Sequence, residues 1–305
     1  MALKRRGKAR KYKHQTICAG SARFGARNDA IGFNCHCASL SRFESDLNLP
    51  RRTRGMSSQP YSPLSIALEL SREAGAKLLE RRDSAEAVEK DDGTLVTQAD
   101  IESDRYICNQ IRTEFPEDTV LSEELNTMVS GTSRVVWVID PLDGTTNYIR
   151  GLPLWGVSIA RLVDGQPDLG VIYFPMLNEL YHATRGGGAF QNQKQISVSD
   201  QEIMENNYLF SCSSHALYRH EVRTKCKIRV LGSAAYGLCL IAHGNILAGM
   251  EADPKIWDLA AAWLLVEESG GFIHTLDGVN PFPLAAGRDY AGMSFPVMAA
   301  ASREL

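Results

Sequence analysis

The chain has 305 residues, of which 44% are hydrophobic and 23% charged, and such a composition predicts an ordinary globular protein with one large domain or two small ones. No apolar run approaches the roughly 20 residues of a membrane helix, so no membrane association is expected. Residues 1–55 hold 13 of the 33 Lys and Arg residues but 3 of the 36 Asp and Glu residues, a net charge of +10 that leaves −13 for the rest. A body this acidic argues against nucleic acid as a partner and suits a protein that holds cations.

Residues 1–55 form a basic extension without sustained periodicity. Organellar transit peptides have such a composition, rich in Arg, containing Ser and short of acids. Met56-Ser-Ser-Gln-Pro also resembles a natural N-terminus, so translated upstream sequence is a second interpretation, and a nucleic-acid-binding arm is a third. In each case we expect the extension to be disordered, and the protein to be cytoplasmic, or plastid if the extension is a transit peptide.

Residues 56–198 are expected to form an α+β half of the domain. Ser62-Pro63 begins a helix with apolar residues at helical spacing, and an extended piece at 94–100 leads into a second helix over about 100–115. Strands are predicted at 119–122, 135–139, 154–161, 168–174, 180–184 and 196–198. Two helices followed by successive strands are typical of α+β proteins.

Residues 199–305 alternate between strands and helices, which indicates an α/β half. Strands are predicted at 207–212, 227–231, 248–252, 272–276 and 296–300, and helices at 217–222, 233–243 and 256–269. The four cysteines of the body, Cys108, Cys212, Cys226 and Cys239, form no C-x-x-C pair and are expected to be reduced core residues.

The stretch from Val135 to Ile149 carries the strongest chemical signal. Val135–Ile139 predicts a short buried strand that ends at Asp140, because Pro141 cannot donate to a sheet ladder. Asp143 and Gly144 then make a turn before a helix that opens at Thr145. Two carboxylates beside free backbone N–H groups can hold divalent cations and a phosphate. Taken alone, the stretch is also compatible with an ordinary Asp-Gly turn.

Other acids follow the ends of apolar elements, namely Asp100, Glu123 and Asp258. Each could be a surface acid. Asp258 is the most unusual, because it lies at the head of an almost wholly apolar helix. It is either a ligand that completes a metal site with Asp140 and Asp143, or an acid favoured by the helix dipole.

Four motifs resemble, in order and spacing, those of the inositol monophosphatase family of Mg²⁺-dependent, lithium-sensitive phosphatases. They are Asp140-Pro-Leu-Asp-Gly-Thr-Thr-Asn, Ser122-Glu-Glu, Trp257-Asp-Leu-Ala-Ala and Leu95-Val-Thr-Gln-Ala-Asp. The likeness runs from about Ser62 to the C-terminus and implies an α/β fold, the layered αβαβα sugar-phosphatase fold. Lys227-Ile-Arg-Val-Leu-Gly-Ser and Pro281-Phe-Pro-Leu look most like a branch found in cyanobacteria and plastid-bearing lineages.

The resemblance implies two Mg²⁺ ions, with a third, weaker one near Glu123. Glu123, Asp140 and the carbonyl of Leu142 would hold one ion, and Asp140, Asp143 and Asp258 the second. Asp140 would then bridge both. Hard oxygen ligands of this kind suit Mg²⁺.

The resemblance also implies catalytic roles. Thr145 and Asp100 would orient the attacking water, with Glu123 assisting as base, and the N–H groups of Gly144 and Thr145 would cradle the phosphate. The residues implied to bind substrate are Asp143, Gly144, Thr145, Gly232, Ser233, Ala234, Glu251 and Asp258.

Three residues carry open alternatives. Glu251 would accept hydrogen bonds from substrate hydroxyls, or it is a solvated acid at a strand end. Lys90 could contact phosphate or water, but a solvated turn lysine is the favoured interpretation. Lys255 could accept a second phosphate. The histidines, among them His215, show no metal spacing or nucleophile partner and are expected to be surface or core residues.

The predicted function is that of a Mg²⁺-dependent phosphomonoesterase acting on a small polyol phosphate, foremost inositol monophosphate. Asp253-Pro254 resembles histidinol-phosphate phosphatases, and Lys255-Ile-Trp-Asp resembles 3′(2′),5′-bisphosphate nucleotidases, so both remain alternatives. A non-catalytic family member acting as a partner protein is the alternative outside enzymes. The family resemblance also implies a homodimer.

Overall fold

The computed structural model describes residues 62–82, 86–90, 93–129, 133–201 and 205–305, and the predicted basic extension lies outside them. The helices are α1 Pro63–Arg81, α2 Gln98–Glu114, α3 Thr145–Ile149, α4 Ser214–Arg219, α5 Ala234–Ala242 and α6 Ile256–Glu268. The strands of the first half are β1 Ala87–Glu89, β2 Leu95–Thr97, β3 Thr119–Ser122, β4 Val135–Asp143, β5 Gly156–Val163, β6 Gln166–Phe174, β7 Glu179–Thr184, β8 Gly188–Gln191 and β9 Lys194–Ile196. Those of the second half are β10 Leu209–Cys212, β11 Lys227–Arg229, β12 Ala248–Glu251, β13 Phe272–Thr275 and β14 Val297–Ala300.

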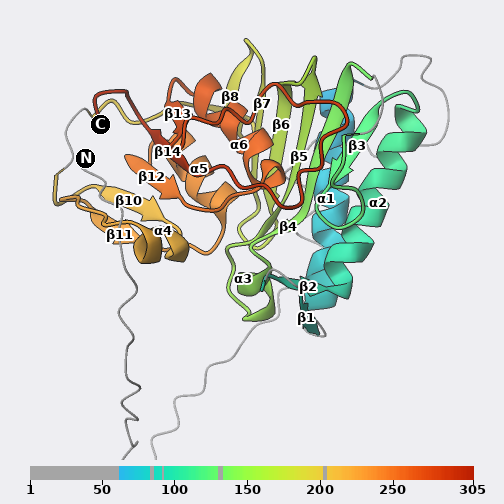
Figure 1. The fold of residues 1–305 in the computed structure, drawn as a ribbon, viewed down its shortest axis with the longest axis horizontal. Helices are drawn as coiled ribbons and strands as arrows, with labels where there is room; N and C mark the ends of the chain where they lie inside the picture. Colours follow the sequence, from blue (N-terminus) through green and yellow to red (C-terminus); the bar gives the residue numbers. More distant parts are fainter. Residues whose placement is uncertain (1–61, 83–85, 91–92, 130–132, 202–204) are drawn as a thin grey trace, which may run out of the picture. The chain divides into compact units, whose positions relative to one another are not determined.

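Within residues 62–305 the elements stack in five layers (Figure 1). Helices α1 and α2 cover one face of a seven-stranded sheet of order β3-β4-β5-β6-β7-β8-β9, and α5 and α6 cover the other. A five-stranded sheet of order β11-β10-β12-β14-β13 follows, with α4 beside β12. The predicted layered fold is confirmed.

The first helix begins where the sequence predicts, and the second begins at Gln98, two residues before the predicted start near residue 100. Ser62 accepts a hydrogen bond from the N–H of Ser65 at 3.1 Å, and Pro63 occupies the first turn, where its missing N–H costs nothing. Helix α2 is capped by Thr97, whose hydroxyl accepts from the N–H of Asp100, while the Asp100 carboxylate accepts from the N–H of Thr97. This reciprocal capping turns Asp100 inward.

Strand β4 continues past Pro141, so the prediction that it ends at Asp140 is wrong. Asp140 pairs with Ser158 of β5 and Asp143 pairs with Gly156, with a register shift of one residue between them. A proline fits at such an irregularity because its missing N–H removes no ladder bond there. The shift carries both aspartates to the end of a buried strand.

Some boundaries in the second half also differ from the prediction. Helix α4 occupies Ser214–Arg219 rather than residues 217–222, because the Ser213 hydroxyl accepts from the N–H of Ala216 and starts the helix earlier. Strand β1 was not predicted, and it pairs with β2 in a two-stranded sheet whose turn carries Lys90. The Arg185-Gly-Gly-Gly turn joins β7 and β8, as expected.

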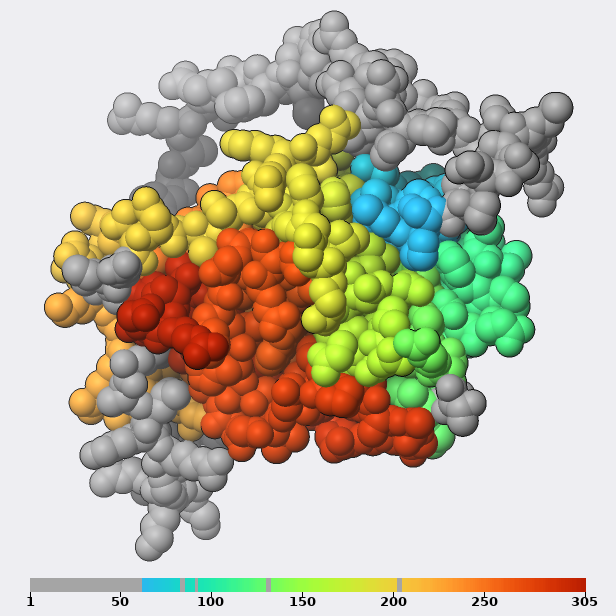
Figure 2. Space-filling view, turned by 90° about the horizontal axis from the view of Figure 1, so that it is seen from above, coloured from blue at the N-terminus to red at the C-terminus, as the bar shows by residue number. Residues whose placement is uncertain are grey.

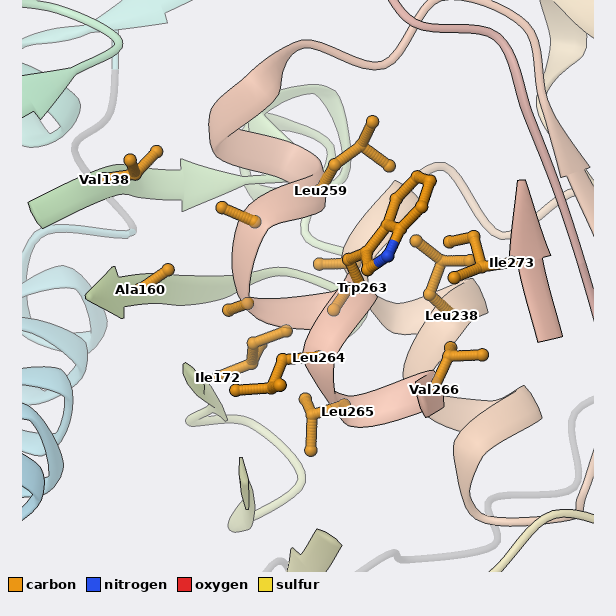
Figure 3. Close-up of a cluster of buried hydrophobic side chains, with 14 of the residues drawn as sticks. Val138, Ala160, Ile172, Leu238, Leu259, Trp263, Leu264, Leu265, Val266 and Ile273 are labelled. Atoms are coloured by element: carbon orange, nitrogen blue, oxygen red, sulfur yellow. The ribbon is translucent and has the colours of Figure 1, made fainter. Parts of the chain in front are cut away.

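The largest apolar core lies between the seven-stranded sheet and α5 and α6. Figure 3 shows Trp263 of α6 beside Leu238 of α5 and Ile273 of β13, with Val138 of β4 across the helix. In Figure 2 the C-terminal part of the chain (orange to red) lies against the segments of the seven-stranded sheet (green to yellow). Cys108, Cys212, Cys226 and Cys239 are buried and free, as predicted. Among the described residues, none of the helices has the length and apolar character to cross a membrane.

Candidate functional site

The end of strand β4 places two carboxylates inside the protein. Asp140 is 1% exposed and Asp143 is 6% exposed. The N–H of Leu142 donates to Oδ1 of Asp140 at 2.9 Å, and the Ser233 hydroxyl donates to Oδ2 of Asp143. The N–H groups of Ala234 and Ala235, in the first turn of α5, also donate to Asp143.

A third carboxylate reaches the same point from the start of α6. The N–H of Lys255 donates to Oδ2 of Asp258 at 2.7 Å, so Asp258 caps the helix from its first turn. One carboxylate oxygen from each of Asp140, Asp143 and Asp258 lies within 4.8 Å of the other two. The helix-dipole and metal-ligand interpretations of Asp258 are therefore compatible, because a carboxylate has two oxygens and several acceptor positions.

The three acids repel one another in a dry environment. Burial, followed by the charge of Asp258, raises the pKa of Asp143 to about 7. Burial and the charges of Glu123 and Asp258 raise the pKa of Asp140 well above its ordinary range, and burial raises that of Asp258. Buried carboxylates clustered at this distance are stabilised by a cation, and an all-oxygen donor set fits Mg²⁺.

Glu123, at the end of β3, faces the same cleft but is paired with a lysine. The ammonium of Lys90 lies 2.9 Å from Oε1 of Glu123 and 2.5 Å from Oε1 of Glu124. Burial raises the pKa of Glu123 to about 8, although Lys90 partly offsets it. The favoured interpretation of Lys90 as a solvated turn lysine is wrong, because its side chain is 25% exposed and held by two carboxylates.

The predicted pair of Thr145 and Asp100 is in contact. The Thr145 hydroxyl lies 3.1 Å from Oδ1 of Asp100 and 3.1 Å from the carbonyl oxygen of Leu142, and its single proton can go to one of them at a time. Thr97 donates to the other Asp100 oxygen through its N–H and its hydroxyl. Burial raises the pKa of Asp100 to about 6.

The opposite wall of the cleft comes from the second half of the chain. Gly232 has φ +75°, and a Cβ there would lie 2.7 Å from Oδ1 of Asn147. The Asn147 amide donates to the carbonyl oxygens of Leu154 and Leu231, at 2.7 and 2.8 Å. Gly232 therefore allows close packing of this wall against α3.

Glu251 is not a solvated acid at a strand end. It is 9% exposed, and burial and the charge of Asp143 raise its pKa to about 8. The Ser213 side chain forms a hydrogen bond with it. Ser213 also lines the cleft.

Sequence reasoning missed a cluster at the rim. Nδ1 of His215 lies 2.6 Å from Oδ2 of Asp253, and Arg219 forms an ion pair with Oδ1 of the same carboxylate. His215 is a surface residue, as predicted, but it has an acidic partner that the sequence did not indicate. Residues four apart, such as His215 and Arg219, lie on one face of a helix, which indicates that they could share a partner. Nothing in the sequence indicates that Asp253 is that partner.

These groups line one cleft of about 930 Å³. Residues from both halves contribute, and its predicted members are Lys90, Glu123, Asp140, Leu142, Asp143, Gly144, Thr145, Gly232, Ser233, Ala234, Glu251, Lys255 and Asp258. Asp100 does not line the cleft and reaches it through Thr145. Of the predicted site residues, all the others therefore meet in one place.

Five alternating layers, with acids gathered where strand β4 ends and helix α6 begins, define the class of layered α/β sugar-phosphatase folds with a site suited to divalent cations. The chain belongs to the inositol monophosphatase family, whose sequence profile matches residues 61–304.

Relatives and solved structures agree with this assignment. The Nus factor SuhB of Pasteurella multocida is 36% identical over 232 residues, which cover 72% of this chain and 87% of that protein. The Thermotoga maritima IMPase superposes with a TM-score of 0.67 at 31% identity, covering 78% of this chain and 91% of the other. The inositol monophosphatase of Anabaena (Nostoc) sp. gives a TM-score of 0.63 at 30% identity, covering 78% and 90%.

Proposed function

We propose that the chain is a Mg²⁺-dependent phosphomonoesterase that hydrolyses a small polyol phosphate, foremost inositol monophosphate. The observation that carries this proposal is the cluster of Asp140, Asp143 and Asp258, in which one carboxylate oxygen from each residue lies within 4.8 Å of the other two. Family membership supports a Mg²⁺-dependent phosphatase. The choice of substrate rests on the named structural relatives.

We propose two ions, and the all-oxygen side chains of the site suit Mg²⁺. Glu123, Asp140 and the carbonyl oxygen of Leu142 would hold one, and Asp140, Asp143 and Asp258 the other, with a weaker third ion near Glu123. Bound Mg²⁺ would supply charge neutralisation for the phosphoryl oxygens and a lowered pKa for water.

The protein's own groups would position and deprotonate the attacking water. A water that donates to Oγ1 of Thr145 is oriented while the hydroxyl donates onward to Asp100, 3.1 Å away. A carboxylate with a pKa of about 6 is matched to accept a proton near neutral pH. Glu123 would assist as base when Lys90 holds its other oxygen. The N–H groups of Gly144 and Thr145, at the start of α3, would cradle the phosphate.

On the far wall, Gly232, Ser233 and Ala234 would meet the leaving group. Glu251 would accept hydrogen bonds from its hydroxyls. Burial removes most of the solvation of the Glu251 carboxyl and raises its pKa to about 8. A hydrogen bond from a substrate hydroxyl would take the place of that lost solvation.

Phosphate release from p-nitrophenyl phosphate tests the activity. Wild-type protein with Mg²⁺ should release phosphate, and Asp140→Asn should abolish the release. An exposed acid away from the cleft, changed as Asp277→Asn, is the matched control and should retain full activity. A wild-type protein that releases no phosphate would refute the proposal and favour a non-catalytic partner protein, the alternative suggested by relatives named Nus factor.

A bisphosphate is the second candidate substrate, and a specific observation favours it. His215, Arg219 and Lys255 bring basic side chains to the leaving-group side of the cleft. A panel of inositol 1-phosphate, histidinol phosphate and 3′-phosphoadenosine 5′-phosphate separates the candidates. Loss of activity on the nucleotide alone in Arg219→Gln would identify a second anionic group, while loss on none would assign Arg219 to structure.

A further inference from the structure

One face of helix α2 bonds to two of the segments that line the cleft. Asp100 meets Thr145, and Oγ of Ser103 donates to the carbonyl oxygen of Pro141 at 3.2 Å. Asp104 follows one turn after Asp100 and therefore lies on the same face. It reaches the other segment, the turn that follows β3.

Asp104 is a fully buried carboxylate, 0% exposed. Its Oδ2 accepts from the N–H of Glu124 at 2.9 Å, and its Oδ1 accepts from Sγ of Cys108 at 2.9 Å. The N–H of Leu125 also donates to it. A buried charge requires such partners, and two of these three, the N–H groups of Glu124 and Leu125, directly follow Glu123.

The residue immediately before these two donors is Glu123. Its own N–H donates to the carbonyl oxygen of Ile139 in β4 at 3.2 Å, and the N–H of Ser122 donates to the carbonyl oxygen of Asn126 at 2.7 Å. The backbone on both sides of Glu123 is therefore fixed by hydrogen bonds. Asp104 fixes the backbone immediately after Glu123, whose side chain lines the cleft.

We propose that Asp104 is a positioning residue for the cation site, because it holds the turn that aims Glu123. This inference rests on the proposed function, in which Glu123 is a ligand. Asp104 does not line the cleft and touches neither ion nor substrate. Loss of a group that orients a metal ligand costs about 10–100-fold in metal affinity, so Asp104 should matter at that scale.

The test is calorimetric titration of the full-length protein with Mg²⁺ alone. Asp104→Asn keeps the shape of the side chain but has a single acceptor oxygen where the wild type has two. Its Kd for Mg²⁺ should rise at least about tenfold. Asp118→Asn is the matched control, since Oδ2 of Asp118 accepts from Nε1 of Trp137 at 2.9 Å away from the cleft, and its Kd should equal that of the wild type.

Thermal melting in EDTA separates positioning from general stability. If Asp104→Asn lowers the melting temperature but binds Mg²⁺ within twofold of the wild type, the positioning role is refuted. Should Asp104→Asn fail to fold, Cys108→Ala removes the Sγ donor to Oδ1 of Asp104 and should weaken Mg²⁺ binding, and an unchanged Kd would overturn the inference. A wild-type protein that binds no Mg²⁺ would overturn the cation site itself, together with the role of Asp104.

Discussion

Removing divalent cations should make the stability of this protein fall as the pH rises. In the cation-free protein, Asp143 has a pKa of about 7, raised by burial and by Asp258, whereas an unfolded aspartate titrates near 3.9. Between these values the folded protein binds a proton that the unfolded chain has released. The free energy of unfolding therefore decreases from about pH 4 and reaches its floor above about pH 7.

The size of the effect follows from the shift. About three pKa units, at about 1.36 kcal/mol each, amount to about 4 kcal/mol for Asp143 alone. At about 2–4 °C per kcal/mol for a domain of this size, the melting temperature in EDTA should drop by roughly 10 °C across the range. Glu123, with a pKa of about 8, extends the decrease in stability by about one further pH unit.

Thermal melting between about pH 5 and about pH 8.5, in EDTA and in millimolar Mg²⁺, measures this decrease. The two curves should separate as the pH rises, because Mg²⁺ binds the ionised carboxylates and removes the penalty. Asp143→Asn, which cannot ionise, should make the EDTA curve less steep, while Glu123 and the other buried acids keep part of the decrease. Parallel curves in EDTA and Mg²⁺ would refute the reasoning, since they would show that the acids are not held together by a cation.

Three further predictions concern individual contacts. Ser233→Ala removes both the cap of α5 and a hydrogen bond to Asp143, so urea denaturation should show a loss of about 1–2 kcal/mol; an unchanged midpoint would contradict this. Gly232→Ala places a Cβ 2.7 Å from Oδ1 of Asn147 at a positive φ, so it should lower the free energy of unfolding by about 1–3 kcal/mol and also lower kcat/KM. Wild-type values of both quantities would show that the neighbouring backbone and Asn147 can move to accommodate the Cβ. Lys90→Met removes the cation that competes for Glu123, so calorimetry should show tighter Mg²⁺ binding, and weaker binding would mean that Lys90 supports the site.

The sequence predicted the features that depend on local pattern. Apolar periodicity located α1, α2 and α6, and the motifs around Asp140 and Asp258 located the acids. Strand β4 was predicted too short, because a proline at a register shift cannot be distinguished by sequence from a proline that ends a strand.

Contacts between distant segments account for what was missed. Lys90 was placed in solvent because its partners follow more than thirty residues later, at Glu123 and Glu124. Asp104 was overlooked, since an acid within a helix is normally exposed and nothing local indicates the backbone N–H groups that it accepts from. The pairing of His215 with Asp253 likewise depends on how α4 lies beside β12.

The amide of Asn147 has a consequence for engineering this protein. It bonds to the carbonyl oxygens of Leu154 and Leu231, and so ties the start of α3 to the segment that precedes Gly232. Both bonds are to main-chain atoms, so they do not depend on the side chains of that segment. Residues 232–255 could therefore be replaced by those of a relative with another substrate without a shift in register, provided that the carbonyl oxygen of residue 231 stays within hydrogen-bond distance of Asn147.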